Sequence, residues 1–253
     1  MKLNLFILAC FLTVSTSAQK QLQITYQNLD SETGSYKSSR IELMATPAYC
    51  FSNTLTDIEC TYYGDDMPYI VTHEKIIYKD YKENALYYEE KIDHIFVCEE
   101  LKQFNWQVIN ETDSLLGYQC TKAKTEYRGR AYTAWFTTEL PFRAAPWKFH
   151  GLPGVVLKID SKDEKVKMEA IRLKITEGEK KENPYKKEKC IGYDRFVEIY
   201  LVKRKEFREW VKATSARTGK FGVALDPFRI EKIEDKDAIS LEQAVEMWEK
   251  SNK

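Results

Sequence analysis

The residues best suited to metal binding or nucleophilic catalysis are three histidines and six cysteines in a chain of 253 residues. His73, His94 and His150 form no paired spacing such as HExxH, and the sequence contains no CxxC and no GxSxG stretch. We therefore expect no metal site, no cofactor and no serine nucleophile. For His150 we favour a hydrogen-bonding clasp to its own loop over a general-base role, because the sequence offers it no evident nucleophile as partner.

Pairs of adjacent acidic residues are the second set of candidate catalytic residues, because two carboxylates can together hydrolyse a glycosidic bond. They stand at Asp65-Asp66, Glu89-Glu90 and Glu99-Glu100. Adjacent residues on a strand point to opposite faces, so no doublet places its own two carboxylates on one face at the roughly 5 to 9 Å that this chemistry needs. We interpret the doublets as solvated surface and keep an envelope hydrolase as an alternative function.

Residues 1–18 have the pattern of a secretory signal peptide. Lys2 precedes an apolar run from Leu3 to Val14, and small residues follow up to Ala18. Cleavage there leaves residues 19–253, which we expect to form one domain in the periplasm or cell envelope. Processing before Cys10, with attachment of a lipid, stays open as an alternative.

Export also permits disulfides among the five cysteines that follow the signal peptide. Cys50 with Cys60 is the first predicted pair, because the two flank a short polar segment, and Cys98 with Cys120 is the second. One thiol is left over. We interpret it as buried and inert, with a redox-linked or intermolecular role as the alternative.

Charge and hydropathy exclude two kinds of partner. Removing residues 1–18 takes away Lys2 and no acidic residue, which leaves 38 Lys and Arg against 39 Asp and Glu. A net charge so close to zero argues against nucleic acid and against a polybasic membrane contact. No later segment has the roughly 18 to 20 uninterrupted apolar residues of a transmembrane helix.

Period-two alternation predicts antiparallel strands through most of the chain. The runs are "QLQITYQNL", "YKSSRIELMA", "HEKIIYKDY", "ALYYEEKI" and "HIFVCEEL". Two hairpins follow, one around Arg128-Gly129 and one across the polar "SKDE" between "GVVLKID" and "KVKMEAIRLKI". In the last arm the apolar parity changes, which predicts a β-bulge near Ala170.

Helical spacing replaces this alternation in the C-terminal third, over about residues 193–250. One helix is predicted in "GYDRFVEIYLVKRKEFREWVKATSARTG", with Gly219 as its stop, and a second in "SLEQAVEMWEK", with Ser240 as its N-cap. The predicted fold class is mainly β with C-terminal helices (α+β). We expect a curved antiparallel sheet or half-barrel built from hairpins and partly covered by the helices.

The stretch "HGLPGVVLKI", residues 150–159, is a candidate ligand loop or a turn into a strand. A phosphate-binding loop exposes successive N–H groups and leads into a helix, whereas Pro153 removes a donor and β-branched residues follow. We predict a type II turn over Leu152-Pro153-Gly154-Val155, with a positive φ at Gly154. Gly151 is expected to allow close backbone packing, and Leu152 to act as an apolar plug.

Residues 117–159 resemble the GLPGLI family, exported proteins of Bacteroidota named for the hexapeptide that reads Gly151-Leu152-Pro153-Gly154-Val155-Val156 here. Further elements occur in order: Gly117–Ala123, Gly129-Arg130, Ala134-Trp135, Thr138–Pro141 and Pro146–Phe149. The chain departs from the family at the two valines and at Ala145, where glycine is usual. The resemblance implies an exported, β-rich protein, often associated with outer-membrane transport systems, and no established activity.

The aromatic loop before the turn is where we expect a ligand. Phe142, Trp147 and Phe149 crowd beside His150, and rigid aromatic side chains suit contact with a peptide, glycan or lipid; core packing is the alternative. Arg130 either pairs with Glu139 or contacts a charged ligand. The sequence thus predicts a non-catalytic binding or accessory protein of the periplasm or envelope. Its partner is expected to be an outer-membrane protein, a peptide, a glycan or a lipid.

Overall fold

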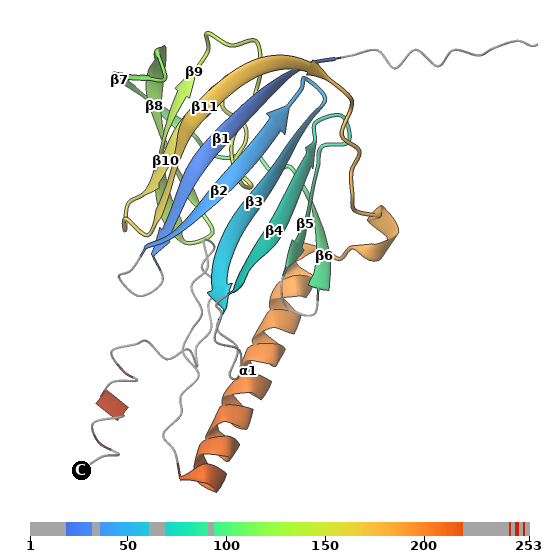
Figure 1. The fold of residues 1–253 in the computed structure, drawn as a ribbon, viewed down its shortest axis with the longest axis vertical. Helices are drawn as coiled ribbons and strands as arrows, with labels where there is room; N and C mark the ends of the chain where they lie inside the picture. The colour runs from blue at the N-terminus through green and yellow to red at the C-terminus, as the bar shows by residue number, and fades with distance from the viewer. Residues whose placement is uncertain are drawn as a thin grey trace, which may run out of the picture.

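The computed structural model describes residues 19–31, 36–60, 69–90 and 94–219, together with residues 243, 246, 247 and 250. Within these ranges eleven strands form one open antiparallel sheet, which curves strongly and is followed by a long helix (Figure 1). The predicted fold class, a curved antiparallel sheet with C-terminal helical structure, is confirmed. The signal peptide predicted at residues 1–18 lies outside the described residues.

The longest connections between described elements are the loop between β9 and β10 and the segment between β11 and α1. The strands are β1 (Gln19–Ser31), β2 (Tyr36–Ala45), β3 (Tyr49–Cys60), β4 (Tyr69–Asp80), β5 (Ala85–Glu90), β6 (Ile95–Glu100), β7 (Gln107–Leu115), β8 (Tyr118–Tyr127), β9 (Arg130–Thr137), β10 (Val155–Ser161) and β11 (Val166–Gly178). A short 3-10 turn, η2 (Lys187–Lys189), and the helix α1 (Tyr193–Thr218) follow.

The sheet consists of two meanders that meet at one seam. Its strand order is β6-β5-β4-β3-β2-β1-β11-β10-β9-β8-β7, so the halves are joined where β1 pairs with β11. Two strands, β3 and β7, were not predicted, because their polar residues hide the alternation. Within the described sheet, the two halves are joined by backbone pairing between β1 and β11.

The predicted bulge lies in β11. Thr25 pairs with Arg172 and Tyr26 with Ala170, so Ile171 is the extra residue, and its side chain is exposed. A bulge bends its strand and increases the local twist. This bend at the seam contributes to the curvature of the sheet, and the prediction of a bulge near Ala170 is confirmed.

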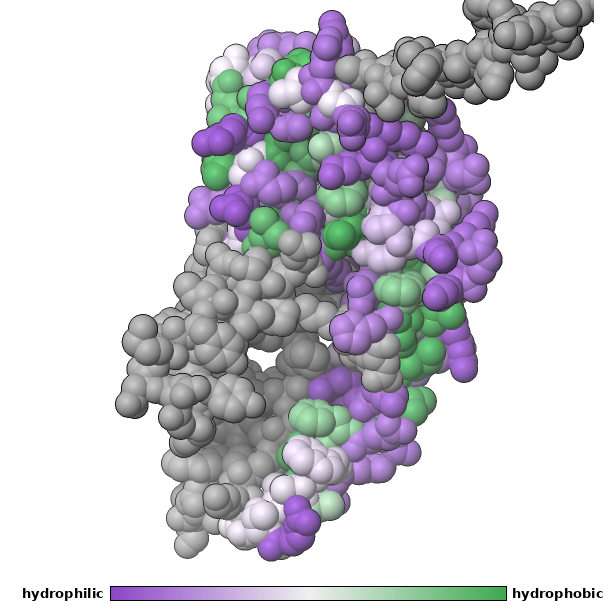
Figure 2. Space-filling view, turned by 45° about the vertical axis from the view of Figure 1, so that its right-hand side comes forward, coloured by the Kyte–Doolittle hydropathy of each residue, from purple (hydrophilic) through white to green (hydrophobic). Residues whose placement is uncertain are grey.

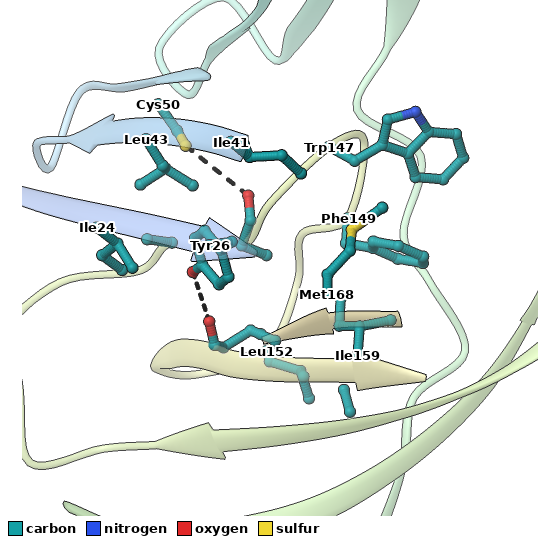
Figure 3. Close-up of a cluster of buried hydrophobic side chains, with 14 of the residues drawn as sticks. Ile24, Tyr26, Ile41, Leu43, Cys50, Trp147, Phe149, Leu152, Ile159 and Met168 are labelled. Carbon is teal, nitrogen blue, oxygen red and sulfur yellow. Dashed lines mark hydrogen bonds between the residues drawn. The ribbon is translucent and has the colours of Figure 1, made fainter. Parts of the chain in front are cut away.

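The inner face of the sheet is filled by the loop between β9 and β10. Phe149 and Leu152 from this loop lie among Tyr26, Ile159 and Met168 from the strands (Figure 3). Phe149 is completely buried. Burying a side chain of this size stabilises a fold by roughly 1.5 to 3 kcal/mol, so the loop is part of the core.

The outer face of β3 to β6 is crossed by the segment between β11 and α1. The backbone N–H of Lys181 donates to the Tyr49 hydroxyl at 2.9 Å, and the Tyr185 hydroxyl donates to the Ile76 carbonyl at 2.8 Å. Cys190 then forms a disulfide with Cys98 of β6, with a Cα–Cα distance of 5.6 Å. The segment is therefore fastened to the sheet at both ends.

Both predicted disulfide pairs are wrong. Cys50 is a free, buried thiol, and Cys60 stands ten residues further along the same strand, roughly 33 Å away at about 3.3 Å per residue. A disulfide needs Cα atoms within about 7 Å. Cys98 is bonded to Cys190 instead, and Cys120, on β8, is also a free, buried thiol.

Only the first turns of α1 pack against the sheet. Its buried side chains are Phe196, Tyr200 and Arg204, whereas the rest of the helix extends beyond the sheet (Figure 1). The helix ends at Gly219, which has a φ of 66°, and the predicted stop is confirmed. Helix α1 therefore covers the sheet only in part. The second predicted helix, near residues 240–250, lies largely outside the described residues.

The face of the molecule beside α1 is mostly hydrophilic, with small hydrophobic groups scattered over it (Figure 2). Among the described residues, no helix combines the length and the apolar character that a membrane crossing requires.

Candidate functional site

A pocket of about 750 Å³ opens beside the "HGLPG" stretch. Three parts of the chain form its wall: the β2–β3 turn at Thr46 and Pro47, the β4–β5 turn with the segment after β6, and the inner loop from Leu140 to Val156. The volume lies within the range of roughly 300 to 1,000 Å³ that is typical of ligand sites. The motif is thus part of a pocket, although its glycines do not cradle the ligand as a phosphate loop does.

The two glycines of the motif have different roles from those predicted. Gly151 has a φ of 93°, whereas Gly154 does not lie in the left-handed region. A Cβ atom on Gly154 would lie 2.0 Å from the carbonyl oxygen of Thr137. The predicted type II turn is therefore wrong: Gly151 supplies the positive φ, and Gly154 allows the close backbone approach.

Backbone hydrogen bonds hold the two arms of the loop together at this point. The Ala144 N–H donates to the Gly154 carbonyl at 3.2 Å, and the Val156 N–H donates to the Ala144 carbonyl at 2.8 Å. Leu152 is buried in the hydrophobic core, as expected for an apolar plug. These contacts fix the position of the pocket wall relative to the sheet.

His150 joins the loop to the segment after β6. Its Nδ1 lies 3.0 Å from the Lys148 carbonyl oxygen and its Nε2 2.7 Å from that of Lys102. The Trp106 indole also donates to the His150 carbonyl at 2.8 Å. Burial lowers the pKa of His150, although the carbonyl contacts oppose this shift. Both ring nitrogens face backbone, which is the geometry of a clasp.

The aromatic side chains of the loop point into the core. Trp147 is 5% exposed and its ring centre lies 5.0 Å from that of Phe149, which is completely buried. Phe142 is also buried, although it contributes to the pocket wall. The expected aromatic ligand surface is therefore not formed: Trp147 and Phe149 fill the inner face of the sheet, and Phe142 alone of the three lines the pocket.

Arg130 pairs with a different partner from the one predicted. Its guanidinium forms an ion pair with Asp163 in the β10–β11 turn. Glu139, the predicted partner, instead accepts a hydrogen bond from the Gln119 backbone at 2.9 Å. Arg130 is buried and lies outside the pocket wall. It stabilises a turn and does not contribute to the candidate site.

A buried lysine behind the pocket was missed by sequence analysis. Lys79 is 0% exposed, and its Nζ donates to the carbonyl oxygens of Ala145 at 2.7 Å and Phe149 at 2.6 Å. The Cys50 thiol contacts the same Ala145 carbonyl (Figure 3). Burial lowers the pKa of Lys79 to about 8, and the nearby Cys50 opposes this. Lys79 lies two residues after Ile77 and therefore on the same, inward face of the strand. This spacing was the feature of the sequence that could have identified it.

A second polar cluster connects the two ends of the open sheet. Arg128, in the β8–β9 turn, forms an ion pair with Glu99 of β6, and its guanidinium carbon lies 3.3 Å from the ring centre of Tyr193. Lys148 Nζ lies 3.6 Å from Glu90 Oε1 and 3.5 Å from the ring centre of Tyr88. The first pair holds β6 against the β8–β9 turn, and the contacts of Lys148 hold the inner loop against β5.

No group of three or more His, Cys, Asp or Glu side chains in the described part of the chain could hold a metal ion. The candidate site is the pocket together with Lys79 and His150, which hold the loop that lines it.

Residues 63–196, just over half of the chain, match the family described as "N-glycanase peptide, N-terminal domain". The chain belongs to this family. No curated protein matches the sequence.

Two solved structures of PNGF-II, in space groups C2 and P21, are 19% and 17% identical to this chain, with TM-scores of 0.46 and 0.48. They cover 64% and 68% of this chain, which spans 28% and 31% of theirs. A domain described as an outer membrane lipoprotein-sorting protein, from Vibrio parahaemolyticus, is 6% identical with a TM-score of 0.25, over 64% of this chain and 88% of that one. The chain thus spans about three-tenths of PNGF-II.

Proposed function

We propose that this chain is a non-catalytic binding or accessory domain of the periplasm or cell envelope, and that its ligand occupies the pocket beside "HGLPG". The observation that carries the proposal is the construction of the pocket wall. Lys79 fixes the loop through two backbone carbonyls, and His150 joins it to the segment after β6. A wall fixed in this way needs little ordering when a ligand binds, which favours affinity.

Location in the envelope is supported by two features of the sequence. Residues 1–18 have the pattern of a signal peptide, and residues 117–159 resemble exported GLPGLI proteins. That resemblance also supports an association with an outer-membrane transport system. The Cys98–Cys190 disulfide agrees with an oxidising compartment.

A second candidate function is suggested by the family match. The family is described as the N-terminal domain of an N-glycanase, so a role in the hydrolysis of N-glycans is the enzymatic alternative. A redox role of a free cysteine is the weaker alternative. Burial raises the pKa of Cys50 and of Cys120, which lowers the fraction of reactive thiolate.

Native mass spectrometry of the protein purified from its own envelope tests the proposal. Gln103 lines the pocket, and Asn105 is an exposed neighbour outside it. We expect a bound ligand or partner in the wild type and in Asn105→Trp, and its loss in Gln103→Trp, whose larger side chain fills the pocket. A ligand-free wild type, or equal occupancy in both variants, would contradict the proposal. Release of a glycan from an N-glycopeptide would favour the enzymatic alternative.

A further inference from the structure

The charges at the pocket have one sign. No Asp or Glu lines it, and Arg143 contributes to its wall with an exposed side chain. Within the described residues Arg143 has no ion-pair partner. Burial raises the pKa of the Tyr81 hydroxyl, and the guanidinium of Arg143 opposes this shift, so the positive charge lies close to the pocket.

A second positive charge lies directly behind the wall. The ammonium of Lys79 contacts the carbonyls of Ala145 and Phe149, and no carboxylate in the described ranges pairs with it. With a pKa of about 8 it is mainly protonated at neutral pH. A buried charge is weakly screened, so its potential extends into the pocket. The pKa of His150, lowered chiefly by burial, is lowered further by this charge.

Two acidic side chains near the rim, Glu100 and Asp80, are held by hydrogen bonds outside the pocket. Glu100 accepts a bond from the Asn84 amide at 2.9 Å. Asp80 accepts bonds from the backbone N–H groups of Lys82 and Glu83, at 2.9 Å and 3.0 Å. Neither carboxylate lines the pocket. The wall therefore offers a cation that is available to an anionic ligand.

The floor of the pocket is apolar. Leu140, Phe142 and Leu152 line it and are buried. Among the residues that the structure describes, no carboxylate lines this wall to accept hydrogen bonds from the hydroxyl groups of a sugar. The combination of an apolar floor and a rim cation favours a peptide end over a sugar.

We propose that the pocket binds the free carboxyl end of a peptide, with Arg143 pairing with the carboxylate and the last apolar side chain lying against Leu140, Phe142 and Leu152. This inference rests on the proposed binding function and names the ligand for the same pocket. Guanidinium groups suit it because they bind carboxylates through two parallel hydrogen bonds.

Isothermal titration calorimetry with two small probes tests the inference. The probes are the tripeptide acetyl-Ala-Ala-Leu as the free acid and as the C-terminal amide. We expect the wild type to bind the acid about tenfold more tightly than the amide, the difference typical of one charged hydrogen-bonded pair. Arg143→Gln should lose this preference. The matched control is Arg172→Gln, which changes an exposed arginine of β11 and should retain the preference.

Each contrary result has its own meaning. Equal binding of acid and amide would overturn the carboxylate inference and leave peptide binding intact. Binding of glucuronic acid, but of neither peptide, would assign the pocket to acidic sugars and overturn the peptide. If no probe binds while native mass spectrometry still shows an envelope ligand lost in Gln103→Trp, the inference fails and the proposed function stands. If both experiments are negative, both fail.

Discussion

Replacing Lys79 with Met tests how the inner loop is held. The ammonium is fully buried and donates to two carbonyls, and its pKa is about 8 instead of 10.5. Between these values the unfolded chain binds more protons than the folded chain. The free energy of unfolding therefore rises with pH above 8, and this contribution is lost as pH falls through 8. It amounts to about 3 kcal/mol over the whole interval and about 1 kcal/mol between pH 7.5 and 9.

Urea unfolding at pH 7.5 and pH 9 measures this difference. The pH range of the measurement ends at 9 because of Cys50. Burial raises the pKa of the Cys50 thiol in the folded chain, and the resulting contribution to stability is lost as pH rises above the unfolded pKa of 9.0. We expect the wild type and the control Lys82→Met, in an exposed turn, to gain about 1 kcal/mol at pH 9. Lys79→Met should show no such gain. The same gain in Lys79→Met, or none in the wild type, would refute the assignment of a protonated, buried Lys79.

Three further predictions concern the packing of the fold. Gly154→Ala should lower the free energy of unfolding by about 2 kcal/mol or more, because the added Cβ meets the Thr137 carbonyl. The control is Gly192→Ala, whose Cβ meets nothing within 4 Å. Equal thermal melting of the two variants would contradict the contact at Gly154. Glu99→Gln should lower the free energy of unfolding by about 2 kcal/mol or more, because it removes the negative charge from the largely buried Arg128–Glu99 ion pair. A urea titration that shows a loss of under about 1 kcal/mol would contradict this. Peptide mapping without reduction should find Cys98 linked to Cys190, with Cys50 alkylated after unfolding, and a Cys98–Cys120 peptide would contradict the structure. Replacing both linked cysteines by Ser should lower the free energy of unfolding by about 2 to 4 kcal/mol.

The sequence predicts those elements whose side-chain pattern is local. Alternation identifies most strands, and the change of parity in "KVKMEAIRLKI" predicts the bulge near Ala170, where the structure has Ile171 as the extra residue. By contrast β3 carries the polar Ser52 on its inward face, and β7 is exposed along most of its length, so the pairing of these strands depends on their neighbours more than on their own composition. The Cys50–Cys60 pair is wrong for a related reason, because the polar segment between the two cysteines is itself part of the extended strand β3.

The candidate site depends on contacts that the sequence does not contain. Glycine is favoured both where φ is positive and where another backbone segment approaches closely. The presence of glycine at positions 151 and 154 therefore does not show which of the two has which role. Whether the aromatic loop faces outward or fills the sheet depends on the curvature of the sheet. Lys79 alone had a usable signal, because a lysine on the inward parity of a strand must find partners inside.

The location of the ligand is the central claim, and amide hydrogen exchange tests it most directly. The protein is compared with and without the ligand that co-purifies from its envelope. The account predicts slower exchange at the pocket wall, in residues 81–84, 101–103 and 140–156, and unchanged exchange on the outer segment around Tyr185 and along α1. Protection confined to the outer segment or to α1, with no change at the pocket wall, would contradict it.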